Sequence, residues 1–235
     1  MLKNIEDIII YEDKDIIVCH KPAGMAVQNS RIGAPDMEST LMNYLAMNTK
    51  ETGKMPYIGI VHRLDQPVEG VIVFAKNKKS AASLTSQLTK DGFTKEYLAV
   101  TDKMPEIKAG RLENYLKKDG RTNSSAVVSA NVAGAKKSIL DYEVLNGIDD
   151  ARTVSGKRIF VRIILGTGRH HQIRVQMANA GMPLLGDRKY NSSDKSGYSL
   201  GLCSRKLAFK HPVSQKKMDF VISPNGNCFE GFIEK

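Results

Sequence analysis

Residues 61–76 read VHRLDQPVEGVIVFAK, and this stretch decides what kind of sheet the chain builds. Its later part, residues 71–75, is five apolar residues in a row, which is typical of a strand buried on both faces. Residues 66–70 ahead of it contain a proline and a glycine, which favour a turn. The pattern therefore predicts a tight loop that holds Asp65 at the edge of a buried sheet.

Asp65 has two interpretations. A carboxylate on such a loop can act as a nucleophile, with Arg63 and His62 beside it to touch a polyanionic substrate. Aspartates also cap and stabilise turns through their own side chains. The local pattern alone favours this second, structural interpretation.

The composition is that of an ordinary soluble globular protein, with 41% hydrophobic and 26% charged residues among 235. This length predicts one domain, or one domain with two lobes. No apolar run approaches the roughly 20 residues of a membrane span, and the N-terminus lacks the features of a secretory signal. Cys19, Cys203 and Cys228 are widely spaced, which favours reduced thiols in a cytosolic protein.

The positive charge is concentrated in the last third of the chain. The net charge is +10, and residues 151–235 hold 15 basic and 5 acidic side chains, which accounts for all of the excess. Such asymmetry favours a nucleic acid partner, although an inert basic surface or an acidic membrane would fit the same charge.

The order of apolar segments predicts an α+β fold with a mixed, mainly antiparallel sheet, because strands outnumber helices and do not alternate with them. The expected strands are residues 8–11, 16–19, 71–75, 95–101, 138–145 and 158–165, followed by a late strand that carries Leu207 and Phe209. Helices are expected from Ser39 or Thr40 to about Thr49, and from Lys78 to Lys90. Residues 110–134 predict exposed hairpins and loops, and residues 146–157 a mobile connection.

A second basic motif, GTGRHHQIR, occupies residues 166–174 and is expected to open a helix that ends at Gly181. On such a helix His170, His171 and Arg174 share a face, and the first turn offers N–H groups to a phosphate. Arg174 can instead reach a carboxylate elsewhere and hold it ionised. A solvated basic helix face is the third alternative.

The same motif argues against a cofactor. Its glycines fit neither a dinucleotide loop nor a phosphate loop, so no nucleotide cofactor is predicted. Two adjacent histidines lack the spacing of a metal site, so no metal is predicted either.

Taken together, these segments resemble the RluA-type pseudouridine synthases. HRLD followed by a glycine and an apolar stretch ending in FAK is similar to the catalytic motif of that family. TGRHHQIRVQMANAGMPLLGDRKY and LCSRKLAFKHP resemble its second and third signatures, IVCHKPAGMAVQ its opening strand and loop, and KEYLAV its tyrosine strand. The similarity covers about residues 8–212 and implies one pseudouridine synthase catalytic domain over residues 1–235, with its active site in a cleft across the sheet.

The resemblance implies an isomerase that converts uridine in ribosomal or transfer RNA to pseudouridine. Asp65 would be the nucleophile, which forms a covalent adduct or stabilises charge on the sugar. Tyr97 would pack against the target base, and Arg174 would keep Asp65 ionised. The residues implied to contact RNA are Arg63, His62, Arg169, His171, Leu202 and Lys21.

The chain departs from the family after HRLD, where the family usually has Arg, a variable residue, Thr and Ser before the glycine. Here Gln66, Pro67, Val68 and Glu69 occupy those positions, so a basic residue and two hydroxyls are lost and an acid is gained. Two other functions compete with the isomerase. They are a catalytically silent RNA-binding protein on the same fold, and a glycosidase in which Glu69 is the second carboxylate.

The resemblance also sets expectations for partners. RNA is the expected partner, with no cofactor, no metal, no membrane and no obligatory protein partner. A cytoplasmic monomer is expected, and the chain is expected to lack the small N-terminal RNA-binding domain of many relatives.

Overall fold

The computed structural model describes residues 4–29, 34–48, 55–90 and 92–233. The chain forms two compact units. The first unit contains Met1–Thr94 and Ser204–Ile222, and the second contains Lys95–Cys203 and Ser223–Lys235. Asp65 therefore belongs to the first unit, and Tyr97 and Arg174 belong to the second.

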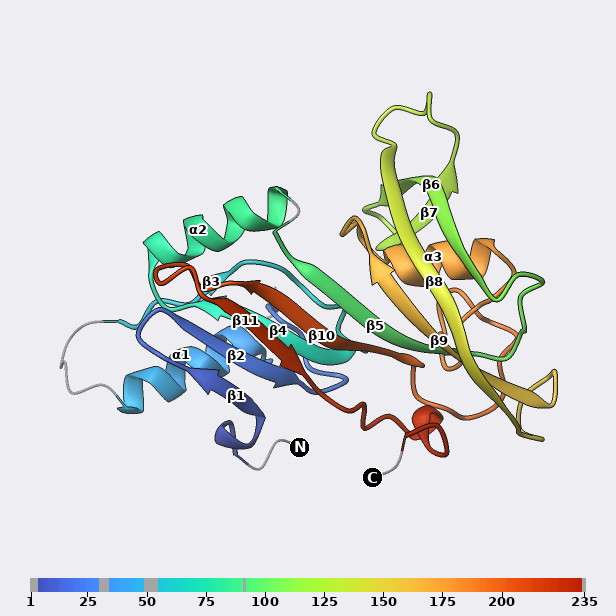
Figure 1. Ribbon diagram of the computed structural model, residues 1–235, viewed down its shortest axis with the longest axis horizontal. Coiled ribbons are helices and arrows are strands. Elements are labelled where there is room, and N and C mark those ends of the chain that lie inside the picture. Colours follow the sequence, from blue (N-terminus) through green and yellow to red (C-terminus); the bar gives the residue numbers. More distant parts are fainter. Residues whose placement is uncertain (1–3, 30–33, 49–54, 91, 234–235) are drawn as a thin grey trace. The chain divides into compact units, whose positions relative to one another are not determined.

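The first unit is built on a sheet in which the strands follow the order β1, β2, β4, β10 (Figure 1). Their bounds are β1 Ile9–Glu12, β2 Ile16–Lys21, β4 Glu69–Ala75 and β10 Leu202–Lys210, of which the part from Ser204 lies in this unit. β3 (Gly59–Ile60) pairs with β4, and β11 (Lys217–Val221) pairs with β10. β1 with β2, β2 with β4, β3 with β4 and β10 with β11 are all antiparallel pairs.

β4 lies at the centre of this unit and is buried along its whole length, as its unbroken apolar run predicts. One face of the sheet packs against the helix α2 (Lys78–Thr89), which contributes Leu84. The buried cluster between this face and α2 consists of Ile16, Val18, Val71, Val73, Ala75, Leu84, Leu207 and Phe209. Burying them stabilises the unit, at about 25 cal/mol for each Å² of apolar surface.

The helix α1 (Met37–Asn48) begins two residues before the predicted start at Ser39. Asp36 explains the difference, because its Oδ1 accepts the N–H of Ser39 at 2.8 Å and caps the first turn. The predicted end at Thr49 lies outside the described residues. The unit also contains the short 3-10 helix η1 (Glu6–Ile8).

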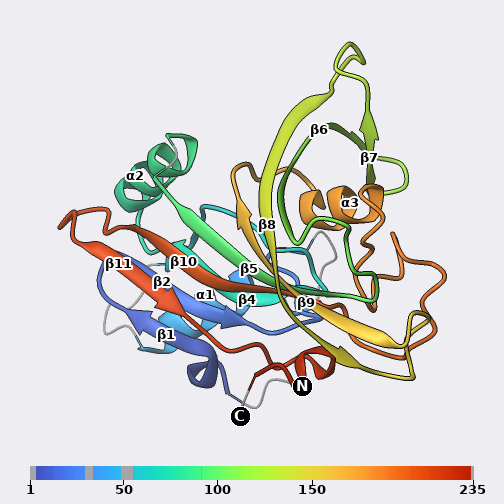
Figure 2. The same cartoon turned by 45° about the vertical axis from the view of Figure 1, so that its right-hand side comes forward.

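The second unit contains a five-stranded antiparallel sheet in the order β5, β9, β8, β6, β7 (Figure 2). Its strands are β5 Thr94–Thr101, β6 Ala109–Asp119, β7 Ser124–Val128, β8 Lys136–Asp149 and β9 Lys157–Leu165. The helix α3 (Gln172–Asn179) contacts β6 and β7, and the 3-10 helix η2 (Asn227–Phe229) follows near the C-terminus. The polar stretch 110–134 thus forms the β6–β7 hairpin, as expected.

Two predicted boundaries are wrong. β8 extends to Asp149, so the first four residues of the expected mobile connection belong to a strand. A shift in register between Val144 and Asn146 explains this, because a bulge absorbs one residue and pairing with β9 continues. β4 begins at Glu69 rather than after Gly70, which reduces the predicted turn to Gln66 and Pro67.

Gly70 permits the close approach of two strands of the first unit. It adopts a φ of +146°, and a Cβ at this position would lie 2.4 Å from the Cβ of Ser204 and 2.6 Å from its backbone nitrogen. No side chain fits there, so β10 can pack against β4 only because the residue is glycine.

The α+β class with a mainly antiparallel sheet is confirmed by both units. All three cysteines are buried and none of them forms a disulfide. Within the described ranges, no helix has the length and apolar character needed to cross a membrane.

Candidate active site

The loop between β3 and β4 carries Asp65. A turn forms directly after this residue, since the N–H of Val68 donates to the carbonyl of Asp65 at 3.0 Å. Asp65 is half-buried and Arg63 is exposed. The loop therefore presents a carboxylate and a guanidinium two residues apart, as the sequence predicts.

His62 holds the start of this loop against β4. Its side chain is buried, and its Nε2 accepts the N–H of Val73 at 3.3 Å. β3 pairs with β4 at Phe74 and Ala75, so the imidazole takes over as acceptor where the backbone of β3 leaves the sheet. The ring also meets Phe93 edge-on, with 6.1 Å between ring centres.

Lys21 fixes the turn that follows Asp65 through a hydrogen bond to its backbone. Its side chain is fully buried, and its Nζ donates to the carbonyls of Pro22 at 2.9 Å, Met25 at 2.7 Å and Gln66 at 3.1 Å. Burial lowers the pKa of Lys21 to about 8, and the negative charges of Asp65 and Glu69 act in the opposite direction. Lys21 is thus a buried cation whose charge interacts with that of Asp65.

A second connection joins the same turn to the loop that follows β2. The N–H of Gly24 donates to the carbonyl of Gln66 at 2.9 Å, and the side-chain amide of Gln66 donates back to the carbonyl of Gly24 at 3.0 Å. Three separate contacts therefore fix the backbone on both sides of Asp65. Such support is what a reactive group needs in order to be held in one orientation.

These contacts change the roles expected for two residues. The sequence suggests His62 and Lys21 as RNA contacts, but both side chains are buried and bonded to backbone groups of the first unit. A phosphate contact needs a side chain that reaches solvent, so burial favours a positioning role for both residues. Arg63 keeps the exposure that an RNA contact requires.

Glu69, the acid that departs from the family pattern, is buried at the start of β4. One of its oxygens lies 3.6 Å from Nε2 of His20. The carboxylate of Glu69 therefore belongs to the interior of the first unit.

In the second unit, Tyr97 lies in the middle of β5 opposite Ile163 of β9, and it is 7% exposed. Leu202 is 4% exposed at the start of β10. Both are buried apolar surfaces of the kind against which a base can pack, and β5 begins within one residue of its predicted start.

The start of α3 differs from the prediction. The helix begins at Gln172, and His171 precedes it with a left-handed φ of 54°. The sequence suggested that His170 and His171 share a helical face with Arg174. This prediction is wrong, because both histidines precede the helix. A left-handed residue turns the chain sharply, and periodicity along the sequence does not reveal it.

The two histidines instead enter a side-chain network. Their rings stack with 3.8 Å between centres. Nδ1 of His171 lies 2.8 Å from the hydroxyl of Tyr190, which also accepts the N–H of Ser125 at 2.9 Å. Nδ1 of His170 lies 2.9 Å from Oγ of Ser125, so the network joins the α3 start to β7.

Arg174 pairs with a residue that the sequence analysis did not identify. Its Nε and Nη2 donate to the two carboxylate oxygens of Asp187, at 2.8 and 2.7 Å, and the ring of Tyr190 lies 5.1 Å from the guanidinium carbon. Asp187 and Tyr190 belong to the GDRKY stretch of the second motif. The sequence shows Asp187 followed by two basic residues and a tyrosine. This pattern marks the aspartate, but it does not indicate that its partner is Arg174.

Arg169 is exposed just before α3, and its Nε donates to the carbonyl of Lys137 at 3.0 Å. The side chain of Gln172 accepts the N–H of Arg169 at 3.0 Å and so orders this loop. Arg169 retains an exposed cationic end and remains a candidate for a phosphate contact.

Comparison with known proteins gives a consistent result. The family described as RNA pseudouridylate synthase matches residues 15–179. The ribosomal large subunit pseudouridine synthase D of Zymomonas mobilis is 30% identical over 227 residues, which cover 90% of this chain and 67% of that protein. The RNA pseudouridine synthase YlyB of Bacillus subtilis is 32% identical over 219 residues, which cover 90% of this chain and 67% of that protein. For other relatives the chain spans 65% of their length.

A solved human structure, RNA pseudouridylate synthase domain containing 4, matches with a TM-score of 0.73 at 21% identity and covers 94% of this chain and 90% of that one. This match supports the fold alone. Fold and sequence together define an RNA-modifying isomerase. The chain belongs to the RNA pseudouridylate synthase family.

Proposed function

We propose that this protein converts specific uridines of a structured ribosomal or transfer RNA to pseudouridine, with Asp65 as the nucleophile. The observation that carries the proposal is the loop itself. Asp65 is half-buried on a turn that His62, Lys21 and Gly24 hold in place, within the region that matches the family.

The chemistry follows from the carboxylate. The reaction breaks the bond between uracil N1 and the ribose, turns the base, joins C5 to the sugar and moves the C5 proton away, so that no atom is gained or lost. Asp65 forms a covalent adduct that is later released, or it stabilises positive charge on the sugar while the base turns. Both routes need an ionised carboxylate.

Residues of the second unit complete the proposal. Tyr97 packs against the target base and assists proton removal from C5, and Leu202 lines the same region. The resemblance to the family assigns Arg174 the role of keeping Asp65 ionised, and within the second unit Asp187 orients the guanidinium. Arg63 enters the space that the target nucleotide leaves, because the uridine must be flipped out of its RNA at a cost of a few kcal/mol.

The proposal also covers cofactors, cellular location, oligomeric state and RNA binding. The reaction needs neither a metal nor an organic cofactor, and the protein acts in the cytoplasm as a monomer. RNA binding rests on exposed cations such as Arg63 and Arg169.

The test is chemical mapping of pseudouridines in total RNA from cells that carry or lack the gene, complemented with wild-type protein or with Asp65→Asn. We expect one or a few sites to disappear on deletion, to return with the wild type and to stay absent with Asp65→Asn. Asp219→Asn removes an exposed carboxylate of the same unit and should restore the sites. Restoration by Asp65→Asn would reject Asp65 as the nucleophile, and an unchanged map on deletion would reject the proposed activity.

A further inference from the structure

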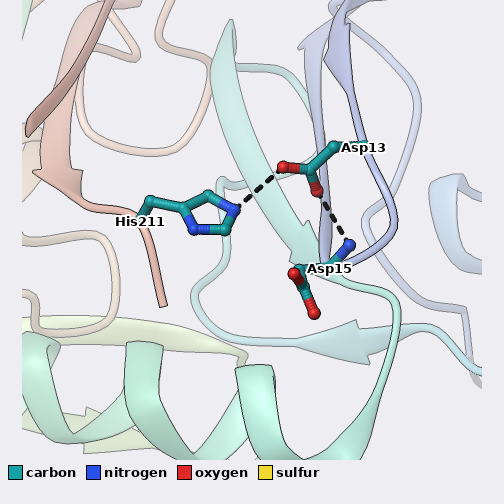
Figure 3. A group of neighbouring side chains, drawn as sticks. All are labelled: Asp13, Asp15 and His211. Atoms are coloured by element: carbon teal, nitrogen blue, oxygen red, sulfur yellow. Dashed lines mark hydrogen bonds and ion pairs between the residues drawn. The ribbon is translucent and has the colours of Figure 1, made fainter. Parts of the chain in front are cut away.

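Three segments of the first unit meet around the buried side chain of Asp15, at the end of β4 opposite the Asp65 loop (Figure 3). Oδ1 of Asp15 accepts from the amide of Asn77 at 3.0 Å and from the hydroxyl of Ser80 at 3.3 Å, which ties the β1–β2 turn to the start of α2. The N–H of Asp15 donates to Oδ1 of Asp13 at 2.8 Å.

The third segment is the turn between β10 and β11, which His211 joins to Asp13. Nδ1 of His211 accepts the N–H groups of Val213 at 3.3 Å and Ser214 at 3.0 Å, so the ring proton is on Nε2 and donates to Oδ2 of Asp13 at 2.9 Å. A metal ion would need that same nitrogen without its proton. The hydrogen bonds therefore make Asp13, Asp15 and His211 a structural pin rather than a metal site.

The same turn is also fixed to α2. The backbone N–H of Lys210 donates to the side chain of Gln87 at 2.9 Å, and the amide of Gln87 donates to the carbonyl of Lys210 at 2.8 Å. The hydroxyl of Ser83 donates to the carbonyl of Pro212 at 3.2 Å. Three turns that are distant in sequence are thus held as one rigid surface.

This surface carries a set of exposed lysines that we name the lysine face. Its members are Lys14, Lys78, Lys79, Lys210, Lys216 and Lys217. Three of them, Lys14, Lys210 and Lys216, adjoin or bond a residue of the pin. Lys14 separates Asp13 from Asp15, and the carbonyl of Lys216 accepts the N–H of His211 at 2.8 Å.

None of the six lysines forms an ion pair with a described residue. The nearby acids are already engaged, since Glu12 pairs with Lys76 at 2.5 Å, and Asp13 pairs with His211. The six lysines outnumber the two carboxylates of the pin, so the lysine face keeps a net positive charge.

Two of these placements do not favour folding. Lys78 and Lys79 occupy the first turn of α2, where the helix dipole is positive and no residue of the turn is acidic, although the buried carboxylate of Asp15 lies against this end of the helix. Lys210 and Lys217 lie directly opposite each other on the antiparallel pair β10–β11, where like charges repel. Local placements that oppose stability are expected where a surface serves a ligand.

We propose that the lysine face is a second RNA-binding surface, which holds the sugar-phosphate backbone away from the target uridine. The proposal rests on RNA being the substrate, as proposed above. The seven residues of β4 separate this face from the Asp65 loop by about 20 Å, at about 3.3 Å for each residue. A structured RNA extends over such a distance, and flexible lysines bind phosphates without reading sequence.

The test compares two variants with the same net charge. In the face variant, Lys14, Lys78, Lys79 and Lys216 become Gln. In the control variant, four exposed lysines of the second unit, Lys103, Lys108, Lys157 and Lys195, become Gln. The affinity of each protein for a labelled RNA hairpin is measured across a range of KCl concentrations, together with its thermal unfolding.

The face variant should bind the hairpin roughly tenfold more weakly at physiological salt, and the slope of log affinity against log salt should fall by about 1 for each lysine that contacts a phosphate. The control variant should lose less on both measures. The melting temperature of the face variant should equal or exceed that of the wild type, because repulsion is relieved. Equal losses in the two variants would overturn the proposal, since net charge alone would then explain them.

Further outcomes distinguish an RNA-binding surface from a surface for an acidic protein, and failure of this proposal from failure of the proposed activity. Wild-type RNA binding by the face variant, together with lost binding to poly-glutamate, would overturn the proposal in favour of an acidic protein partner. If the wild type forms no pseudouridine while the two slopes still differ, the proposed activity fails and the RNA-binding surface stands. If pseudouridine forms and the slopes agree, the surface fails alone.

Discussion

Arg174 and Asp187 form a buried two-point ion pair, in which the side chains of the two residues are 6% and 0% exposed. The carboxylate is itself fixed, since one of its oxygens also accepts the backbone N–H groups of Lys189 at 3.0 Å and Tyr190 at 3.2 Å. This leaves the guanidinium in a single orientation. Any role of Arg174 in catalysis therefore depends on Asp187.

Removing Asp187 should destabilise the protein strongly. Asp187→Ala removes the carboxylate that bonds the buried guanidinium at two points, which costs about 3–5 kcal/mol of unfolding free energy. Urea unfolding of the wild type and the variant measures this difference. The exposed pair between Arg111 and Asp141 is the matched control, because it has the same two-point geometry with side chains 62% and 44% exposed. Asp141→Ala should cost less than about 1 kcal/mol, and equal costs for the two variants would contradict the assignment.

Asp187→Asn tests positioning separately from stability. The amide keeps the shape and one acceptor but loses the charge and the second acceptor, so Arg174 is less firmly oriented. We expect kcat for pseudouridine formation to fall at least tenfold with little change in KM, and Arg174→Ala to give a similar loss of kcat. A rise in KM with unchanged kcat would indicate that the pair serves RNA binding instead.

Because of Lys21, we expect stability and activity to respond to alkaline pH in opposite directions. Its folded-state pKa of about 8 is below the usual value of 10.5, so the folded protein loses this proton before the unfolded chain does. The unfolded state therefore binds more protons between about pH 8 and pH 10.5, and the contribution of Lys21 to stability rises with pH in that window. Activity should fall over the same range, because the cation near Asp65 and one donor to the loop carbonyls are lost.

Variants distinguish Lys21 from a second lysine with a similar pKa. Burial also lowers the pKa of Lys95 to about 8, so Lys95→Met serves as the control. Lys95→Met should retain the alkaline loss of activity, and Lys21→Arg should remove it because arginine stays charged. Urea unfolding at pH 7 and pH 10 and initial rates over the same range are the measurements. An unchanged pH profile in Lys21→Arg would exclude Lys21 as the group responsible.

Much of the fold was predictable because its signals are local. The apolar run in β4 and the helical spacing of Ala81, Leu84 and Leu88 in α2 each fix the type of an element. The resemblance to the family then singled out Asp65, Tyr97 and Arg174 as candidate site residues, a choice that no local pattern makes.

The remaining features depend on contacts between distant residues. Asp187 lies 13 positions after Arg174, and Lys21 lies 45 positions before the carbonyl of Gln66 that it bonds. No periodicity relates such pairs. Burial is equally hidden, because a lysine or histidine in a sequence suggests a surface charge, whereas Lys21 and His62 are enclosed and bonded to the backbone.

Gly70→Ala should disrupt the contact between β4 and β10. The added Cβ would lie within 2.6 Å of three atoms of Ser204, two of which belong to the backbone, so neither strand can yield locally. The strained φ of +146° adds to the cost, and we expect a loss of at least about 2 kcal/mol of unfolding free energy. Gly120→Ala is the control, since no atom lies within 4 Å of the position that its Cβ would take and the change should be close to neutral. A neutral Gly70→Ala would show that the strands separate easily.

Variants of His62 test how much its hydrogen bond to β4 contributes to the stability of the Asp65 loop and to activity. His62→Phe keeps an aromatic ring against Phe93 but leaves the buried N–H of Val73 without this acceptor, which costs about 1–3 kcal/mol. His62→Gln restores an acceptor and should recover part of both stability and activity. Urea unfolding and single-turnover rates with a substrate RNA measure the two effects. Arg63→Ala, at the exposed neighbouring position, should change stability by less than about 0.5 kcal/mol. If His62→Phe weakens RNA binding but leaves stability unchanged, His62 contacts the RNA and does not position the loop.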